Sequence, residues 1–431
     1  TDAYVEYIRD LSGMRINAYD MGLNPKHWNQ RISAQEALSY LDVNKDDIAE
    51  FMLLAEPQTA TYQRLKKQLI EFSEQQEISN LEPISFNQIA RPGRGYDDIP
   101  KLRARLGLDA VDGAERYKYD DQLFQAVKYF QEKKGLKPDG LIGKQTLFAL
   151  NQTELQKVKQ IIINMERLRW VPEQKPDRFI LVNIPSYTLW AVENGKVEFE
   201  MPVIVGRKKR KTLSFVSHVH GVRFNPTWTV PKTIKREDIL PHLQEDPTYL
   251  TGKGMELFDG YGPDALTLDP TSIDWQNIPL EELYALNMVQ APGANNPLGY
   301  IRILMPNNHN IYLHDTNERY LFSRTNRALS SGCVRMKDPE KIANFIMRAK
   351  SNWTDEKMKN ILAEGKMTDL YTSEKMPVYF LYHTVWIGSD NQIVYGPDVY
   401  NDDKKLLQLL EKLDEIPKVS NNDASITLAY Q

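Results

Sequence analysis

The sequence predicts a multidomain α+β protein, in which a helical scaffold with an inserted small helical module is followed by a mostly β domain that carries a cap subdomain. Apolar residues recur at helical spacing before Pro176. After it, short segments rich in β-branched and aromatic residues end at Gly, Asn or Pro, as strands do. The 431 residues, 41% of them hydrophobic, suffice for roughly two to four such domains.

The helical scaffold is predicted in two pieces, residues 1–95 and 152–176. Ser33 is expected to cap a helix over Ala34–Leu41, because its side-chain oxygen can accept a free backbone N–H at the helix start. A further helix is predicted from apolar residues at helical spacing: Tyr62, Leu65, Leu69 and Phe72. Three prolines and two glycines interrupt the segment 78–100, which therefore predicts a boundary of loops and turns.

A compact helical module is predicted at residues 96–151. One apolar edge of it is formed by Leu102, Leu106 and Leu108. Asp121 is expected to cap a helix whose apolar side chains are Phe124, Val127 and Phe130. The helical pattern then resumes at Leu155, Val158, Ile162 and Met165. Packing of this last helix on the N-terminal helices would make the module an insertion within the scaffold.

The β-rich domain is predicted at residues 177–402, where segments such as RFILVNIP and EFEMPVIVG are typical of strands. Within it, residues 237–288 are richer in turns and acidic side chains, which predicts a cap that departs from the sheet. The remaining residues, 403–431, are expected to form a C-terminal helix and tail. Five leucines between Asp403 and Leu413 make that helix amphipathic.

Composition excludes several classes of function. The 54 basic and 58 acidic side chains give a formal net charge of −4, which argues against nucleic acid as a partner. His218 and His220 share one face of a strand, but no third ligand stands at a metal-binding spacing, so no metal site is predicted. No phosphate-binding or dinucleotide motif is present, and no cofactor is expected. The basic run 207–211 is expected to be a solvated hairpin turn, with contact to anionic glycan or phospholipid as a secondary option.

The single cysteine, Cys333, is the candidate nucleophile. It follows Gly332 in the sequence SSGCVR, and His314 stands upstream in YLHD. An unperturbed thiol is only about 3% ionised at pH 7, so a neighbouring imidazole that takes its proton would activate it. Gly332 permits a tight turn, after which the amides of Gly332 and Cys333 can face a developing oxyanion. On these residues alone, a packed cysteine and a satisfied core histidine remain the alternative.

This arrangement resembles the catalytic domain of the L,D-transpeptidases, enzymes that cross-link peptidoglycan through a cysteine acyl-enzyme. The resemblance covers about Phe179–Asp402 and includes the segment Ala291–Gly299. The sequence AVKYFQEKKGLKPDGLIGKQTLFALN is similar to the small peptidoglycan-binding module often attached to such enzymes. The order of scaffold, inserted module and catalytic domain resembles the large Gram-negative subtype, which carries a mobile cap over the active site.

The resemblance implies a two-step acyl transfer without a cofactor. Cys333 would attack the carbonyl between diaminopimelate and the terminal D-Ala of a tetrapeptide stem, while His314 takes the thiol proton and returns it to the departing amine. The amine of a second stem would then attack the thioester. The family pattern also places four residues around the substrate: Tyr312, Trp228, Asn296 and Arg335. For Arg335, binding a substrate carboxylate and pinning the loop around Cys333 stay open as alternatives.

Two positions depart from the pattern of many family members. Those members have His where this chain has Ser331, and Gly where it has Asp315. The large subtype tolerates both departures. They leave the third catalytic group open, as a main-chain carbonyl near Ser330 or Ser331 or as the carboxylate of Asp315.

The resemblance also implies partners and a compartment. Peptidoglycan tetrapeptide stems are expected as donor and acceptor, and carbapenem β-lactams as covalent inhibitors, while a partnership with other wall synthases stays open. Because mature wall lies outside the cytoplasmic membrane, the expected compartment is the periplasm, with anchoring or export through an N-terminal segment absent from this chain. Two other functions stay open: a non-catalytic peptidoglycan-binding scaffold, and an L,D-carboxypeptidase of the same fold with water as the acceptor.

Overall fold

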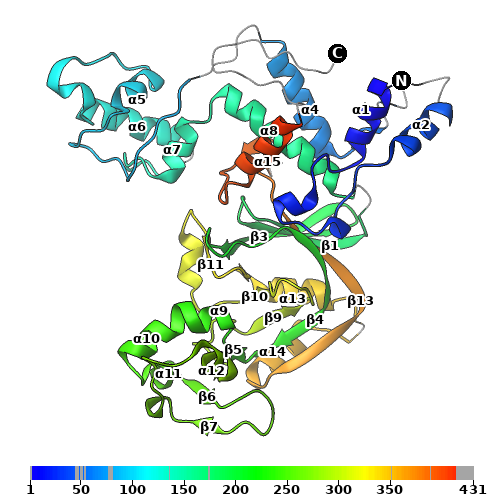
Figure 1. Ribbon diagram of the computed structural model, residues 1–431, viewed down its shortest axis with the longest axis vertical. Coiled ribbons are helices and arrows are strands. Elements are labelled where there is room, and N and C mark those ends of the chain that lie inside the picture. The colour runs from blue at the N-terminus through cyan, green and yellow to red at the C-terminus, as the bar shows by residue number, and fades with distance from the viewer. Residues whose placement is uncertain are drawn as a thin grey trace. The chain divides into compact units, whose positions relative to one another are not determined.

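The computed structural model describes residues 2–43, 48, 52, 55–75, 81–134, 136–172, 175–350, 352–388 and 390–413. The chain forms two compact units. The helical unit comprises Thr1–Glu173 and His383–Gln431, and the β unit comprises Gln174–Tyr382. Helices dominate the first unit and strands the second (Figure 1), which confirms the predicted fold class. Of the predicted C-terminal region, the tail at 414–431 lies outside the described residues.

The scaffold part of the helical unit follows the predicted pattern. Its elements are α1 (Asp2–Ser12), η1 (Ala18–Met21), η2 (Pro25–His27), α2 (Ala34–Val43), α4 (Ala60–Ser73), α8 (Glu154–Trp170), the hairpin β14 (Val385–Ile387) and β15 (Ile393–Tyr395), and α15 (Asp402–Lys412). Ser33 caps α2 as predicted, since its Oγ accepts the N–H of Glu36 at 3.1 Å and Glu36 accepts the N–H of Ser33 at 2.9 Å. Tyr62, Leu65 and Phe72 of α4 pack with α8 in one buried core.

Charged side chains are buried in pairs within this unit. Glu166 on α8 is fully enclosed and accepts hydrogen bonds from Arg15 Nε at 2.7 Å and from Arg169 Nη1 at 3.3 Å. Arg167 pairs with Asp403 of α15. Burial alone would raise the pKa of Glu166, but the two guanidinium groups and the hydrogen bonds hold that pKa below its usual range. The Glu166 carboxylate therefore stays charged inside the protein.

The small helical module has its own core. Its helices are α5 (Ile99–Arg105), η3 (Gly113–Tyr117), α6 (Asp121–Lys133) and α7 (Lys144–Leu150). The core begins at Ile84, whose main chain exchanges hydrogen bonds of 2.8 and 2.7 Å with the amide side chain of Asn151, so the module includes residues before its predicted start. The prediction that Asp121 caps α6 is wrong by one residue. Asp120 keeps an extended backbone and its Oδ1 accepts an N–H of the first turn at 2.8 Å, whereas Asp121 is already helical.

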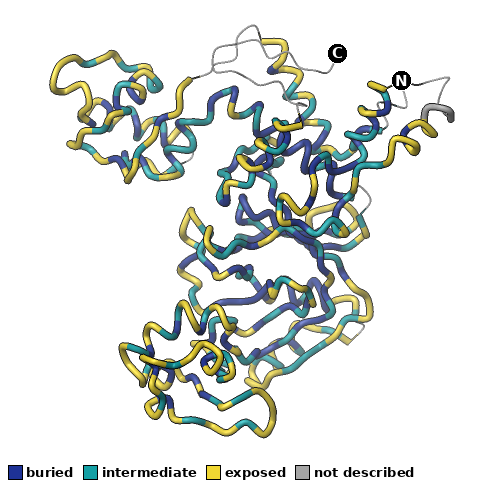
Figure 2. Tube along the Cα trace, in the orientation of Figure 1, coloured by how far each residue is buried: buried dark blue, intermediate teal, exposed yellow. Residues whose placement is uncertain are grey.

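The β unit is built on a sheet that closes on itself. Its strands are β1 (Arg178–Asn183), β2 (Thr188–Glu193), β3 (Lys196–Gly206), β4 (Phe215–Phe224), β9 (Ile301–Leu304), β10 (Leu313–His314), β11 (Ala328–Ser330), β12 (Val334–Met336) and β13 (Thr368–Leu381). Their spatial order is β11-β3-β12-β10-β9-β4-β13-β1-β2, and β2 also pairs with β3. Figure 2 shows that buried residues follow these strands. The unit ends at Tyr382, so the hairpin β14–β15, predicted within the domain at 177–402, belongs to the helical unit.

Helices and a cap subdomain complete the β unit. The helical elements outside the cap are η6 (Arg319–Ser323), α13 (Pro339–Met347) and α14 (Asp355–Ala363). The cap itself contains β5 (Trp228–Thr229), α9 (Lys232–Ile234), the π-helical turn η4 (Lys235–Ile239), α10 (Leu240–Glu245), α11 (Tyr249–Gly252), β6 (Met255–Phe258), β7 (Thr267–Leu268), η5 (Pro270–Ser272), α12 (Leu280–Ala285) and β8 (Asn287–Gln290). The cap has its own sheet, β5-β8-β6-β7, and its own buried core. It therefore begins at Trp228, before the predicted start at 237. Within the described ranges, no helix is long and apolar enough to cross a bilayer.

Candidate active site

The strand register brings four of the predicted site residues onto one face of the sheet. β10 pairs in parallel with β12, with Leu313 opposite Val334 and His314 opposite Arg335. Leu313 and Val334 are fully buried on one side. Because side chains alternate along a strand, the neighbouring positions point to the other side. That face therefore holds Tyr312, His314, Cys333 and Arg335.

The imidazole of His314 is buried and held by the main chain of the following residue. Its Nδ1 lies 2.5 Å from the carbonyl oxygen of Asp315. A carbonyl only accepts hydrogen bonds, so Nδ1 carries the proton and Nε2 is the basic nitrogen of the ring. Burial, followed by the charge of Arg335, lowers the pKa of His314 to about 3. The ring is therefore neutral at pH 7 and able to accept a proton.

The carboxylate of Asp315 is engaged by the chain and side chain beside it. Its Oδ2 accepts the N–H of Tyr300 at 2.9 Å, and its Oδ1 accepts from Arg319 Nη1 at 3.2 Å. Gly299, with φ of +59°, lies against it so closely that a Cβ there would stand 2.3 Å from the carboxylate carbon. The group that contacts the ring is the main-chain carbonyl of Asp315, which was not among the groups predicted for the third position.

The thiol of Cys333 is neutral in the resting protein. The residue is partly exposed, and its Sγ lies 3.6 Å from the carbonyl oxygen of Asn310, to which it donates. Burial of the sulfur raises the pKa of Cys333, and the N–H of Tyr312 and the charges of Arg302 and Arg335 offset only part of that rise. In the part of the chain that the structure describes, no hydrogen bond joins the thiol to His314.

The loop that presents Cys333 is fixed by three hydrogen bonds. Gly332 has φ of +120°, a conformation that favours glycine. The Oγ of Ser330 donates to the carbonyl of Cys333 at 2.5 Å and accepts the N–H of Gly332 at 3.1 Å. Thr212 Oγ1 donates to the carbonyl of Gly332 at 2.7 Å. Of the two amides expected to face an oxyanion, that of Gly332 is therefore already engaged in the resting protein.

Ser331 is exposed and is tied to the cap through Arg210. Arg210 Nη1 donates to Ser331 Oγ at 2.9 Å, and the same guanidinium pairs with Glu237 at 2.5 Å and with Asp238 at 2.6 Å on η4. Its side chain is only 9% exposed. The prediction of a solvated turn at 207–211 is therefore wrong for Arg210, because its guanidinium is buried in ion pairs with the two carboxylates of the cap.

The other predicted substrate residues take structural positions. Arg335 Nη1 donates to Glu318 Oε2 at 2.5 Å. Trp228 packs against the core of the cap. Asn296 is 1% exposed, and its side-chain amide donates to the carbonyls of Pro226 and Ala291 at 2.9 and 3.1 Å. The side-chain amide of Asn296 therefore stabilises the surrounding loop through hydrogen bonds to main-chain carbonyls.

Two residues beside the thiol were missed by the sequence analysis. Asn310, with φ of +53°, aims its carbonyl at Cys333. Arg302 stands on β9 directly opposite His314, with its guanidinium carbon 3.8 Å from the centre of the Tyr312 ring. An arginine between two buried isoleucines of a strand is the signal that marks Arg302. No comparable signal in the sequence marks Asn310.

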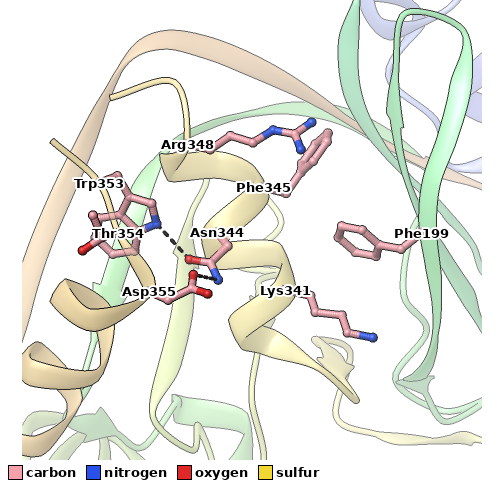
Figure 3. Close-up of a pocket in the computed structure, with 8 residues that line it drawn as sticks. All are labelled: Phe199, Lys341, Asn344, Phe345, Arg348, Trp353, Thr354 and Asp355. Carbon is pink, nitrogen blue, oxygen red and sulfur yellow. Dashed lines mark hydrogen bonds between the residues drawn. The ribbon is translucent and has the colours of Figure 1, made fainter. Parts of the chain in front are cut away.

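A cavity of about 340 Å³ lies elsewhere in the β unit (Figure 3). Its lining is Phe199, Lys341, Asn344, Phe345, Arg348, Trp353, Thr354 and Asp355. The polar groups there satisfy one another, since Trp353 Nε1 donates to Asn344 and Asn344 donates to Asp355, both at 2.8 Å. Within the described residues, no three His, Cys, Asp or Glu side chains are grouped to hold a metal ion. The face around Cys333 is therefore the candidate active site.

Comparisons with known proteins point to the same kinds of domain. Residues 177–375 match the family model of the "L,D-transpeptidase catalytic domain", residues 1–69 match a "Scaffold domain", and residues 102–150 match a "Putative peptidoglycan binding domain". A curated protein of Haemophilus influenzae, "Putative L,D-transpeptidase", is 36% identical over 260 residues, which cover 60% of this chain and 51% of the relative. The chain thus spans about half the length of the curated relative it matches.

Solved structures of similar proteins were also found. An L,D-transpeptidase from Mycobacterium smegmatis is 10% identical, with 48% of this chain and 58% of that chain covered and a TM-score of 0.25. An L,D-transpeptidase from Stackebrandtia nassauensis is 14% identical, with 70% and 97% covered and a TM-score of 0.21. The family models and the curated relative confirm the resemblance that the motifs predicted.

Proposed function

We propose that the chain is a peptidoglycan L,D-transpeptidase, because residues 177–375 match the model of the L,D-transpeptidase catalytic domain and other segments match a scaffold domain and a "Putative peptidoglycan binding domain". It cross-links the diaminopimelate residues of stem peptides through a Cys333 thioester and releases D-Ala. One observation carries this proposal. A partly exposed thiol shares a sheet face with a buried, neutral imidazole whose Nδ1 proton is held by a carbonyl, which leaves Nε2 to act as the base.

The first step starts from a neutral thiol and a neutral imidazole. Burial disfavours the thiolate of Cys333 and the imidazolium of His314 alike, so the proton moves only as the sulfur attacks. The thiol first turns from the carbonyl of Asn310 toward His314. Sγ then bonds to the carbonyl carbon of diaminopimelate, Nε2 takes the thiol proton, and the C–N bond to D-Ala breaks as the same proton passes to the departing amine.

The negative charge that develops on the substrate oxygen needs hydrogen-bond donors. The Gly332 amide is occupied by Ser330 Oγ, so the Cys333 amide is the donor that we assign to the oxyanion. The Asp315 carbonyl keeps the ring of His314 in the required tautomer, in the way that a carboxylate does in serine-protease triads. Because a main-chain carbonyl cannot be removed by substitution, the role of this hydrogen bond is tested by substituting His314.

The second step decides between cross-linking and trimming. The side-chain amine of a second diaminopimelate attacks the thioester, the C–S bond breaks, and the thiol regains its proton through His314. Water at the same position would hydrolyse the thioester, which is the L,D-carboxypeptidase alternative. Both outcomes share the acyl-enzyme, and the yield of cross-link against free acid measures their ratio.

The proposed activity also implies inhibitors, partners and a compartment. A strained β-lactam ring of the carbapenem class would acylate Cys333 in place of the stem peptide. The module at 84–151 would hold the protein on its polymeric substrate, and other wall synthases are proposed to supply that substrate nearby. Because the wall lies outside the cytoplasmic membrane, we place the activity in the periplasm.

The test compares the whole chain with its Cys333→Ala variant on purified tetrapeptide stems. The intact chain is expected to release D-Ala and to give dimeric peptides by mass spectrometry, whereas the variant gives neither. Thermal unfolding and sedimentation with peptidoglycan serve as controls, and both should be unchanged in the variant. Absence of D-Ala release from the folded intact chain would leave the wall-binding scaffold as the function. Equal turnover by the variant would remove Cys333 from the mechanism.

A further inference from the structure

Arg302 occupies the centre of the candidate active face. In the sheet, β9 lies between β10 and β4. Arg302 is opposite His314 on one side and opposite Arg223 on the other. Residues directly opposite each other across paired strands share a face of the sheet. Arg302 therefore points to the same side as Cys333, His314 and Tyr312.

The guanidinium of Arg302 has an aromatic contact but no anion. Its central carbon lies 3.8 Å from the centre of the Tyr312 ring. Its Nε is buried and has no hydrogen-bond partner. Across the described residues, the guanidinium of Arg302 makes no hydrogen bond or ion pair with another side chain or with the main chain. A buried donor without an acceptor costs free energy, and that cost is removed when a ligand supplies the acceptor.

The carboxylates that pair with the other arginines of this face are already engaged. Asp369 receives two hydrogen bonds of 2.7 Å from Arg223, which engage both of its oxygens. Glu318 is held by Arg335 at 2.5 Å. Burial and the charge of Arg223 lower the pKa of Arg302, as expected for a cation that lacks its own counter-ion. The face thus presents one arginine whose anion must come from outside.

We propose that Arg302 binds the terminal carboxylate of the acyl donor, the carboxylate of the D-Ala that departs. The order of strands supports this choice, since Cys333 directly precedes β12, while His314 and Arg302 lie on β10 and β9, and these three strands are neighbours about 4.8 Å apart. In the donor, the reacting carbonyl, the departing amine and the terminal carboxylate follow one another in the same order. A guanidinium matches a carboxylate with two parallel hydrogen bonds. This inference rests on the proposed function and predicts that a donor needs a free terminal carboxylate.

The test measures peptide binding rather than turnover. In the Cys333→Ala background, calorimetry compares the tetrapeptide acid with the same peptide as its C-terminal carboxamide. Arg302→Gln is expected to weaken binding of the acid by about 10- to 100-fold and to leave binding of the amide unchanged. A third peptide, in which lysine replaces diaminopimelate, lacks the side-chain carboxylate and should keep the full dependence on Arg302. Loss of that dependence would assign Arg302 to the diaminopimelate carboxylate and overturn the proposal.

Two further variants guard against trivial causes. Arg348→Gln removes one positive charge at the cavity of Figure 3 and should leave binding of both peptides unchanged. Arg302→Lys keeps the charge without the two-pronged geometry and should fall between the parent and Arg302→Gln. An equal loss for acid and amide in both Arg302 variants would show that Arg302 only shapes the site, against the proposal.

The outcomes for this inference and for the proposed function are separable. If the intact chain binds the acid through Arg302 but releases no D-Ala, the transpeptidase proposal fails and the carboxylate site stands. If the intact chain releases D-Ala from the acid donor and D-alaninamide from the amide donor equally well, the transpeptidase proposal stands and the assignment of Arg302 fails.

Discussion

The arginines of the helical unit and those of the candidate active face are arranged on opposite principles. In the helical unit, Arg15 and Arg169 enclose Glu166, and Arg167 pairs with Asp403, so each buried guanidinium meets a carboxylate. On the active face, Arg302 has none. In both places, burying a charged group costs solvation free energy, but only in the helical unit do ion pairs within the chain offset that cost. A paired buried arginine therefore marks architecture, and an unpaired one marks a place for a ligand.

Titratable groups follow the same division. For Glu166, two cations and several hydrogen bonds outweigh burial, and its pKa falls below the usual range. For Cys333, cations lie near as well, but burial outweighs them and the pKa rises. Burial acts in both places, and the number of direct partners decides which form survives. The helical unit is thus built to keep its charges, and the active face is built to keep its reacting groups neutral until substrate arrives.

The largest effect is expected from removing the carboxylate that the helical unit depends on. Glu166→Ala removes the buried carboxylate that contacts both Arg15 and Arg169 and leaves Asp10, 3.9 Å from Arg15, as the remaining acid, which should cost about 3–5 kcal/mol of local stability. Hydrogen–deuterium exchange of peptides from α8 measures that loss directly. Arg302→Gln is the matched case, and it should change the stability of the β unit by less than about 1 kcal/mol, because only a cation–π contact is lost.

The contrast between paired and unpaired arginines fails if Glu166→Ala and Arg302→Gln lower stability by similar amounts. A cost at Arg302 as large as that at Glu166 would mean that the active-face arginine is architectural too. A negligible cost at Glu166 would mean that water reaches the two arginines once the carboxylate is gone.

The next effect concerns the pH dependence of thiol alkylation. Because burial raises the pKa of Cys333 above its ordinary value, the thiolate is scarcer at pH 7 than in a free thiol and increases as pH rises. Alkylation by iodoacetamide should therefore speed up about tenfold for each pH unit between about pH 7 and 9. Its midpoint should lie above that of the same protein unfolded in urea.

A flat rate from acid to neutral pH would contradict this expectation. It would reveal a preformed thiolate–imidazolium pair, stabilised by partners that outweigh burial, and the active face would then resemble the helical unit. The His314→Gln variant is the control. It should leave the midpoint unchanged if the resting histidine is neutral, and raise it if the histidine is charged.

Much of the fold was predictable because its signals are local. The cap of α2 at Ser33 and the apolar spacing of α4 depend on residues within a few positions, and the structure confirms both. Limits of domains were less predictable, because they are set by distant contacts. Ile84 joins the small module through Asn151, and no local pattern announces that pairing.

The candidate site divides in the same way. Cys333, His314 and Tyr312 lie within recognisable motifs, and the register of two strands then places them on one face. Arg302 lies in a third strand and acquires its meaning only from strand order, which the sequence does not state. The carbonyl that holds the imidazole was also beyond prediction, because any residue supplies one and only backbone geometry selects that of Asp315.

The smallest effect decides how Arg335 acts beside Arg302. Glu318, whose side chain is 41% exposed, pairs with Arg335, so breaking that pair should cost no more than about 1 kcal/mol. If Arg335 only pins the loop, Glu318→Gln and Arg335→Gln should have similar small effects that do not add in the double variant, and binding of the tetrapeptide acid should stay within about twofold. If Arg335 instead binds substrate, Glu318→Gln should strengthen binding of the acid and Arg335→Gln should weaken it. If calorimetry shows that the two variants change the binding affinity in opposite directions, the active face has two arginines that bind substrate carboxylates. An arginine paired with a carboxylate could then bind substrate as well as stabilise the fold.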